Sequence, residues 1–318
     1  MRAPKVWAQG FTGQGIVLGN IDVGFQWDHP ALKNHYRGWN GTAANHNYNW
    51  YDMTDPTNRA PIDPNGHGTH TVGTMVGDDG GTNQIGVAPG AKWIGCRAMD
   101  ISGLGTPETY IGCLEFMLAP WDLDGNNPNP AKAPVAVSNS WHCSISAGEC
   151  PDQTVLFTAV HNLRAGGLVP VMSTGNSGPA CQTVGIDGPP AQYDDSFSVG
   201  ATTSTNTLAS FSSRGPASFQ GVRIKPDIVA PGQSVRSSYP PSTYASLSGT
   251  SMAAPHIAGV IALIYSAKPS LIGDVDATEQ LIEYTAQHLR SADCSSSGDF
   301  PNNLYGWGLV NAARAVKR

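Results

Sequence analysis

Short apolar runs alternate with longer segments of helical periodicity along most of this chain. The apolar runs of strand length are residues 15–22, 93–98, 135–139, 168–173 and 196–199. The segments with helical spacing lie near residues 67–76, 107–118, 153–164, 252–268 and 277–288. Buried parallel strands are apolar without alternation, and strands that alternate with helices form sheets covered on both faces. The pattern therefore predicts an α/β fold, with a mainly parallel β-sheet and helices on both faces.

Composition is typical of a folded globular protein rather than a disordered one. Of the 318 residues, 40% are hydrophobic and 13% are charged. The chain shows no repeats or long linkers, so we expect a single domain over residues 1–318. The formal net charge of −6 offers no basic footprint for nucleic acid. No segment approaches the roughly 18–20 apolar residues that span a bilayer, and we expect no membrane contact.

The first candidate for chemistry is a serine at the start of the helix predicted near residues 252–268. Gly249 permits a sharp turn, and Ser251 is a good N-cap residue. Pro255 fits this helix only in its first turn, where a missing N–H costs nothing. Such a serine is by itself usually only a helix cap, so its significance depends on a base and a carboxylate elsewhere.

A base and a carboxylate precede Ser251 in an order known for catalytic triads. His67 lies between Gly66 and Gly68, which would leave room for a substrate to approach the imidazole. Asp22 ends the apolar run at residues 15–22 and would emerge at the carboxyl edge of a parallel sheet, where such sheets place ligands. The order Asp, His, Ser is one of the convergent orders of the Ser-His-Asp triad.

Four short motifs contain these residues and one asparagine. They are Ile21-Asp22-Val23-Gly24, Gly66-His67-Gly68-Thr69-His70, Ser173-Thr174-Gly175-Asn176-Ser177-Gly178-Pro179 and Gly249-Thr250-Ser251-Met252-Ala253-Ala254-Pro255-His256. In kind and order they resemble the motifs of the subtilases, a family of serine peptidases with a subtilisin-like three-layer fold. The resemblance covers nearly the whole chain. Residues 28–32, 36–39, 91–97 and 302–308 resemble the bacillopeptidase F-like branch.

The resemblance implies a serine endopeptidase that hydrolyses proteins through an acyl-enzyme. His67 would take the proton of Ser251 as the hydroxyl attacks a peptide carbonyl, and Asp22 would orient the imidazole. Asn176 and the backbone N–H of Ser251 would stabilise the oxyanion of the tetrahedral intermediate. Asn176 is also a plausible turn residue, and the two roles can coexist. The chemistry needs no cofactor.

One position departs from the family pattern. Subtilases usually have Ser or Thr after the catalytic Asp, where the hydroxyl can hydrogen-bond the carboxylate, whereas this chain has Val23. Losing a hydrogen bond to a charged group would matter by about 1.5–3 kcal/mol if nothing replaced it. Asn20, Thr69 or a water molecule are the candidates for replacing it.

The resemblance also implies two segments that flank an extended substrate and form the walls of the pocket for its P1 residue, the one before the cleaved bond. The residues expected there are Ser138, Asn139, Ser140, Trp141, Ser173, Thr174 and Gly175. Trp141 is alternatively an aromatic anchor packed under the site. Asp187 and Gly188 lie near the expected base, where Asp187 would favour a basic P1 side chain unless a loop insertion moves it out of reach.

The six cysteines are an even number, which fits an extracellular enzyme. Cys143 and Cys150 enclose a short polar loop and are the best disulfide candidate. Cys96 and Cys113 are either bridged or two core thiols. In the first case a long-range pair remains, Cys181 with Cys294.

Subtilases often use calcium as a structural ion. Residues 122–127 alternate oxygen-bearing side chains around Gly125 but lack the terminal Glu of an EF-hand, and a solvated polar loop explains them equally well. Residues 78–83 occupy the region of a subtilase calcium loop without matching its residues well. The sequence therefore leaves structural calcium open and assigns no metal ligands.

Further expectations come from the resemblance alone. The chain opens near Trp7, where the mature part of a subtilase would begin. This implies secretion, a removed signal peptide, and a propeptide that aids folding and inhibits the enzyme. We expect a monomer that acts on protein or peptide substrates, with His70 and His256 in structural roles. The rival hypothesis is a catalytically silent binding protein on the same fold, which only Val23 favours.

Overall fold

A seven-stranded parallel sheet runs through the centre of the computed structural model, which describes residues 1–318. The strands lie in the order β2-β3-β1-β4-β5-β6-β7, and every neighbouring pair is parallel. Their bounds are β1 Val17–Asp22, β2 Trp50–Asp52, β3 Lys92–Arg97, β4 Ala136–Asn139, β5 Val169–Ser173, β6 Phe197–Thr202 and β7 Ile228–Pro231. The predicted parallel sheet is confirmed.

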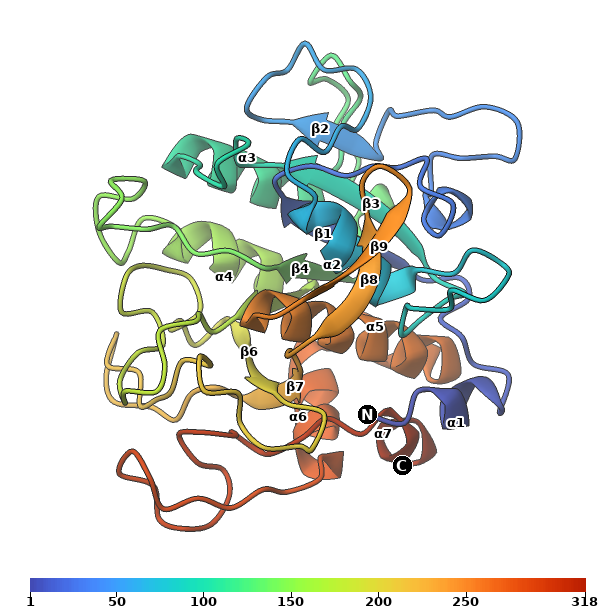
Figure 1. Ribbon diagram of the computed structural model, residues 1–318. Helices are drawn as coiled ribbons and strands as arrows, with labels where there is room; N and C mark the ends of the chain where they lie inside the picture. Colours follow the sequence, from blue (N-terminus) through green and yellow to red (C-terminus); the bar gives the residue numbers. More distant parts are fainter.

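Helices on both faces make the sheet the middle of three layers (Figure 1). The four main helices are α2 His67–Val76, α3 Pro107–Leu118, α4 Phe157–Ala165 and α5 Thr250–Ala267. Val171 belongs to the core under α2 and α5, whereas its neighbour Met172 belongs to the core under α3 and α4. Successive strand side chains point to opposite faces, so these strands are apolar throughout because they supply two cores.

Smaller elements surround the three layers. A two-stranded antiparallel sheet packs over α2, and further helices near both ends of the chain do not pack on the central sheet as the main four do. These elements are α1 Pro4–Trp7, β8 Val235–Tyr239, β9 Thr243–Leu247, α6 Val275–Thr285, α7 Ala312–Lys317 and the 3-10 turns η1 Lys33–His35, η2 Pro130–Lys132 and η3 Pro269–Leu271.

The apolar pattern predicts some elements closely and misses others. Residues 67–76 and 107–118 are helical as predicted. The helix predicted at 277–288 ends at Thr285, since the backbone of Gln287 pairs with Leu309 instead. Strands β2, β7, β8 and β9 were not predicted. Strand β2 has only three residues, and β8 and β9 have no continuous buried face for a pattern to reveal.

Helix α5 contradicts the expectation that no segment could cross a membrane by length and apolarity. It has 18 residues and a mean hydropathy of 1.3. However, 83% of these residues are buried inside the protein, where α5 contacts four strands from β4 to β7 and helix α2. Its apolarity therefore belongs to the core of the fold.

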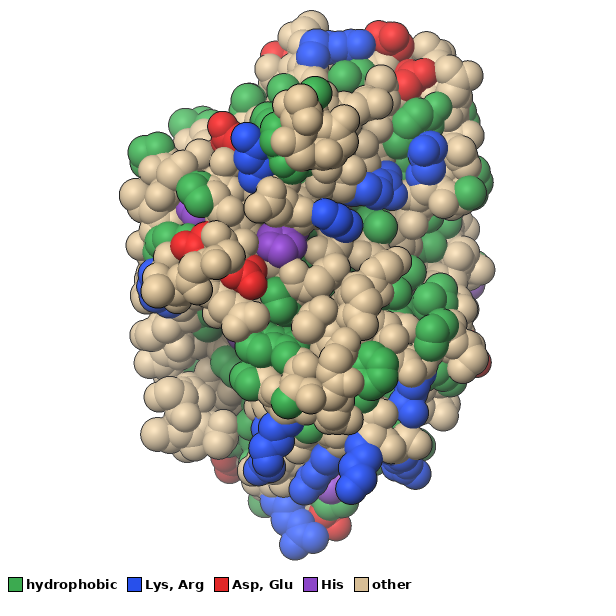
Figure 2. Space-filling model, turned by 90° about the vertical axis from the view of Figure 1, so that its right-hand side faces the viewer, with side chains coloured by type: hydrophobic (Ala, Val, Ile, Leu, Met, Phe, Trp, Pro, Cys, Tyr) green, Lys and Arg blue, Asp and Glu red, His purple; other side chains and the backbone are tan.

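Although the formal net charge of the chain is −6, one end of the molecule is locally basic. Lys and Arg side chains gather at the lower end of the face in Figure 2. Helices α1 and α7 contact each other although they lie far apart in the sequence. An open hollow beside them is lined by Arg2, Lys5, Arg314, Lys317 and Arg318.

All six cysteines are bridged. The expected Cys143–Cys150 disulfide is present, and Cys96 and Cys113 form a bridge rather than two core thiols. The third bridge joins the remaining two residues, which are 113 positions apart. Cross-links of this kind stabilise the folded chain mainly by restricting the unfolded one.

Replacing Ile261 in the middle of α5 by Ala should lower the free energy of unfolding by about 2–5 kcal/mol. Ile261 is fully buried, so the truncation leaves a cavity in the core. Ile272→Ala removes the same atoms from a side chain that is 45% exposed, and should change stability by no more than about 0.5 kcal/mol. Chemical denaturation of both variants measures the difference, and equal losses would contradict the central position of α5.

Candidate active site

The carboxyl ends of β1, β4 and β5 meet the first turns of α2 and α5 at one hollow. This hollow, called the main hollow below, has a volume of about 430 Å³, and its lining includes Asp22, His67, Asn176 and Ser251. Asp22 is the last residue of β1, and His67 is the first residue of α2. Open parallel sheets bind ligands at this edge. The fold therefore brings together the four residues that the sequence selected from separate motifs.

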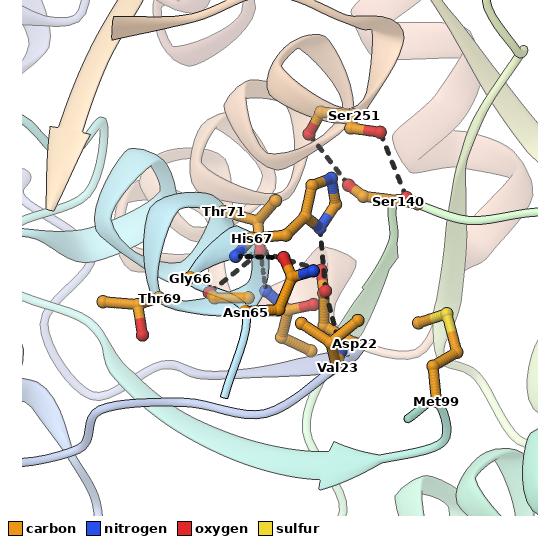
Figure 3. A network of polar contacts seen from close by, with 12 residues as sticks. Asp22, Val23, Asn65, Gly66, His67, Thr69, Thr71, Met99, Ser140 and Ser251 are labelled. Atoms are coloured by element: carbon orange, nitrogen blue, oxygen red, sulfur yellow. Dashed lines mark hydrogen bonds and ion pairs between the residues drawn. The ribbon is translucent and has the colours of Figure 1, made fainter. Parts of the chain in front are cut away.

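Asp22 and His67 form a hydrogen-bonded pair (Figure 3). Nδ1 of His67 lies 2.8 Å from Oδ1 of Asp22, whose side chain is fully buried, while the His67 side chain is 28% exposed. Loss of hydration lowers the pKa of His67, but the charge and hydrogen bond of Asp22 outweigh it, so the pKa is raised above its ordinary value. With Nδ1–H donated to Asp22, Nε2 is left to accept a proton.

Thr71, one turn after His67 in α2, donates to Asp22 the side-chain hydrogen bond that Val23 cannot provide. Its hydroxyl lies 3.1 Å from Oδ2 of Asp22 and within 3.0 Å of a carbonyl of its own helix. Nδ2 of Asn20 donates to the same hydroxyl at 2.8 Å. Of the expected replacements, Asn20 acts only through Thr71, and the hydroxyl of Thr69 bonds a different carboxylate. The missing family hydroxyl is thus replaced from another element.

Ser251 is the second residue of α5 and does not cap it. The N-cap is Gly249, and no side chain caps this helix, so the predicted capping role of Ser251 was wrong. Its hydroxyl is therefore not committed to the helix backbone.

Pro255 lies inside α5 and not in the first turn as expected. Because proline has no N–H, the carbonyl of Ser251 loses its usual partner four residues on. Ser140, the residue after β4, replaces that partner by donating its hydroxyl to the Ser251 carbonyl at 2.8 Å. In return, Oγ of Ser251 donates to the carbonyl of Ser140 at 3.1 Å. These two bonds join the first turn of α5 to the end of β4.

The hydroxyl of Ser251 faces His67 without bonding to it. Figure 3 shows the imidazole between Asp22 and Ser251, while the serine hydroxyl donates to Ser140. A rotation about the Cα–Cβ bond of Ser251 would exchange that acceptor for Nε2 of His67. Catalytic hydrogen bonds are often long or misaligned before substrate binds, so the arrangement is compatible with a nucleophile and its base.

Asn176 presents the donor end of its amide. Its Oδ1 accepts hydrogen bonds from the backbone N–H of Thr250 at 2.9 Å and from the Thr250 hydroxyl at 3.1 Å. Because both partners are donors, the carbonyl end must face Thr250, and Nδ2 is the free end. The left-handed backbone of the turn falls on Gly175, with φ of 100°, and not on Asn176.

Only some of the residues expected to bind substrate have their side chains at the surface of a hollow. Ser140 and Trp141 line the main hollow. A smaller hollow adjoins it, and its lining includes Ser173, Thr174 and Gly175. Ser138 and Asn139 are fully buried in β4 and line neither hollow. Any contact of these two with a substrate would involve their backbone.

Trp141 combines the two interpretations that the sequence allowed. Its ring stacks on Tyr110, with 4.3 Å between the ring centroids, and only 6% of the residue is exposed. It nevertheless contributes to the lining of the main hollow. Trp141 is therefore a packed anchor whose edge forms part of the wall.

Gly66 and Gly68 serve packing within the protein, so the expectation that they leave room for substrate was wrong. A Cβ on Gly68 would lie 2.0 Å from the carbonyl oxygen of Gly24. A Cβ on Gly66 would lie 2.5 Å from the ring of Tyr239, and φ of Gly66 is 99°. Both positions exclude a side chain because the fold itself occupies the space.

His70 and His256 are structural, as expected. Nε2 of His70 lies 3.0 Å from the carbonyl oxygen of Val235, and Nδ1 of His256 lies 2.8 Å from that of Met252. Burial lowers the pKa of each to about 4, so both rings are neutral at physiological pH.

Two carboxylates that hold the walls of the site were missed. Asp63 accepts hydrogen bonds from the backbone N–H groups of Gly66 at 2.6 Å and Thr69 at 3.0 Å, and so fixes the start of α2. An acidic residue just before a helix could have signalled this role. Glu149 accepts from the Tyr110 hydroxyl at 2.7 Å. It lies 39 residues away from Tyr110, so no local pattern could have revealed this contact.

The two loops considered for calcium do not form a cation cage. No three His, Cys, Asp or Glu side chains converge closely enough to hold a metal ion. In the loop at residues 122–127, the Asp122 carboxylate accepts backbone N–H groups, and Asp124 pairs with Arg59 at 2.7 Å. In the loop at residues 78–83, Asp79 likewise accepts donors from its own loop. In both loops the carboxylates are occupied by donors of the protein, and structural calcium stays a prediction without assigned ligands.

Comparison with known proteins agrees with this geometry. The subtilase family model matches residues 13–308, a range that contains all four residues of the site. The chain belongs to the subtilase family. The predicted family is thus confirmed, and with it the class of serine peptidases.

Several relatives of this subtilase are known by name. Bacillopeptidase F of Bacillus subtilis (strain 168) is 44% identical over 99% of this chain, which spans only 21% of that protein's length. Subtilisin DY of Bacillus licheniformis is 33% identical over the whole chain and 96% of its own length. Subtilisin Savinase of Lederbergia lenta is 34% identical over the whole chain and 96% of its own length.

Thr71→Val should lower kcat about 10- to 100-fold, because the isosteric side chain leaves Oδ2 of the buried Asp22 without its donor. Steady-state kinetics on a peptide substrate measures the effect. Thr74→Val is the matched control: Thr74 lies in the same helix, is 1% exposed, and donates only to the carbonyl of His70. Adding Val23→Ser to Thr71→Val should restore part of the rate. Equal rates for the two single variants would contradict the role of Thr71.

Proposed function

We propose that this subtilase is a secreted endopeptidase that cleaves protein chains through an acyl-enzyme on Ser251. The observation that carries the proposal is the convergence of Asp22, His67, Asn176 and Ser251 on one hollow. The three disulfides support secretion, because such bridges persist mainly in oxidising surroundings. The proposal includes a monomeric enzyme with a propeptide as folding aid and inhibitor, and it uses no cofactor.

In the proposed reaction His67 acts as general base. A serine hydroxyl is a weak nucleophile at neutral pH, so Nε2 of His67 takes the proton of Ser251 as Oγ attacks the substrate carbonyl. The resulting imidazolium is stabilised by Asp22, which is 2.8 Å away and buried. The same proton then passes to the leaving amine, and water repeats the sequence to release the acyl group.

Asn176 stabilises the charge that develops on the carbonyl oxygen. Its Nδ2 is free because Thr250 holds the opposite end of the amide, so the donor needs no reorientation during the reaction. The backbone N–H of Ser251 is the proposed second donor to this oxygen. Removing one donor of this kind typically lowers kcat about 10²–10³-fold, as in subtilisin.

The substrate is proposed to lie extended along the ends of β4 and β5. Main-chain hydrogen bonds to an added strand provide affinity, and side-chain pockets provide selectivity. Trp141 lines the main hollow, and Ser173, Thr174 and Gly175 line the smaller one that adjoins it. We propose that the smaller hollow receives the P1 side chain.

The alternative of a catalytically silent binding protein loses its only support. Val23 favoured it because a hydrogen bond to the catalytic carboxylate was missing from the sequence motif. Thr71 restores a hydroxyl to Asp22 at 3.1 Å.

Labelling with a fluorophosphonate should modify Ser251 stoichiometrically, and the protein should degrade denatured casein. Ser251→Ala should abolish both, because it removes the proposed nucleophile, whose side chain lines the same hollow as His67. The control variant is Ser248→Ala, which removes an exposed hydroxyl just before α5 and should leave labelling and cleavage unchanged. Ser140→Ala is less suitable, because the Ser140 hydroxyl donates to the Ser251 carbonyl. A folded wild-type sample that neither labels nor cleaves would support the binding-protein alternative.

The acid limb of the pH profile of kcat/KM should have an apparent pKa above about 6.5, the ordinary histidine value. Asp22 raises the pKa of His67, and His67 must be neutral to act as base, so activity is lost as pH falls through the raised value. Asp22→Asn should move the limb to lower pH and reduce kcat about 10⁴-fold.

The matched control for this profile is Asp28→Asn, which removes an exposed carboxylate outside the site and should leave the limb in place. A wild-type limb at or below the ordinary value would contradict the raised pKa of His67 and its dependence on Asp22.

A further inference from the structure

The smaller hollow, which adjoins the one that Ser251 lines, has a carboxylate in its lining. It joins the main hollow at His142 and Asn176, which line both. Its lining includes the segment from Ser173 to Gly175 and also Asp187. The loop that carries Asp187 has therefore not moved it out of reach of the site.

The Asp187 carboxylate is held firmly from one side. Oδ2 accepts the Ser144 hydroxyl at 2.5 Å, and Oδ1 accepts the Ser146 backbone N–H at 3.1 Å. Backbone pairing at 2.7 Å between Ile145 N–H and the Asp187 carbonyl locks the two loops together. Burial alone would raise the pKa of Asp187, but these hydrogen bonds outweigh it and lower the pKa to about 2. The group is thus a fixed negative charge at neutral pH.

This negative charge has no strong cationic partner in the protein. No Lys or Arg lines the smaller hollow or pairs with Asp187. The one ionisable neighbour is His142, whose Nε2 lies 3.4 Å from Oδ2. That distance exceeds the roughly 2.7–2.9 Å of a charge-assisted hydrogen bond. A partly buried carboxylate that faces a pocket without a full partner favours a cation from outside.

His142 also lines the smaller hollow, and its ring is weakly held. Its side chain is 49% exposed, and its contact with Asp187 is the only hydrogen bond that its ring makes. With the imidazole in place, the hollow holds only about 30 Å³, too little for a long side chain. Because the ring is exposed and weakly held, it can swing away at small cost, whereas Ser173 in the same lining belongs to the buried end of β5.

We propose that Asp187 makes this subtilase selective for Lys or Arg at P1, with His142 as the group that the substrate displaces. The inference rests on the proposed function, since it assigns the P1 pocket of that site. The guanidinium or ammonium of P1 takes the place of the imidazole and pairs with Oδ1 and Oδ2 of Asp187. An uncharged P1 residue leaves the carboxylate with its weak internal partner, and an acidic one is repelled.

The test uses peptides that differ only at P1, with Arg, Lys, Gln or Glu, and measures kcat/KM for each. Wild-type enzyme should prefer Arg and Lys to Gln by about 10- to 100-fold and reject Glu. Asp187→Asn keeps the shape and most hydrogen bonds, and should bring the Arg-to-Gln ratio close to one while the Gln peptide is cleaved at a similar rate. Asp152→Asn, at an exposed carboxylate outside both hollows, should leave the ratio unchanged.

A second variant tests the proposal without changing Asp187, in case the Asp187→Asn protein fails to fold. His142→Ala retains the carboxylate and removes the displaced group, so it should raise kcat/KM for Arg and Lys peptides relative to Gln. Cleavage of Gln and Arg peptides at equal rates by wild type, or an unchanged ratio in Asp187→Asn, would overturn the inference and leave the proposed function intact. Failure to cleave any peptide, together with failure of Ser251 to label, would instead overturn the proposed function.

Discussion

The burial of α5 against the centre of the sheet is the constraint on which the rest of this structure depends. Fifteen of its 18 residues are buried, and it contacts every strand from β4 to β7. A helix in that position has no freedom to slide, because each shift would open cavities along its whole length. The first turn of α5 therefore lies at the carboxyl edge of the sheet. The position of Ser251 is set by the packing of the core, and the polar contacts only adjust it.

The electrostatics of the site follow from a second buried element, the end of β1. Asp22 has no exposed side-chain surface, so donors of the protein take the place of water around its carboxylate. Val23 N–H, Nδ1 of His67 and the Thr71 hydroxyl provide them. Burial of this carboxylate thus holds the imidazole in one orientation, since turning the ring away would leave a buried acceptor short of a partner.

The residues of the site were predictable from sequence because each lies in a short motif with its own local signature. Their arrangement was predictable only as far as the parallel sheet brings strand ends to one edge. The contacts that complete the site join residues far apart in the chain, such as Thr71 with Asp22 and Tyr110 with Glu149. The glycines around His67 were misinterpreted for the same reason, since Gly24 and Tyr239, which occupy the space beside them, lie in other segments.

Two apparent defects of the motifs are each compensated by a distant side chain. Val23 lacks a hydroxyl, and Thr71 provides one; Pro255 lacks an N–H, and Ser140 donates to the carbonyl left free. The second compensation has a functional consequence, because Ser140 also lines the main hollow. The helix that positions the proposed nucleophile and the strand end proposed to hold the substrate are thereby joined through one residue. A displacement of that strand end would strain both hydrogen bonds to Ser251, so we expect binding of the proposed substrate and placement of Ser251 to be coupled.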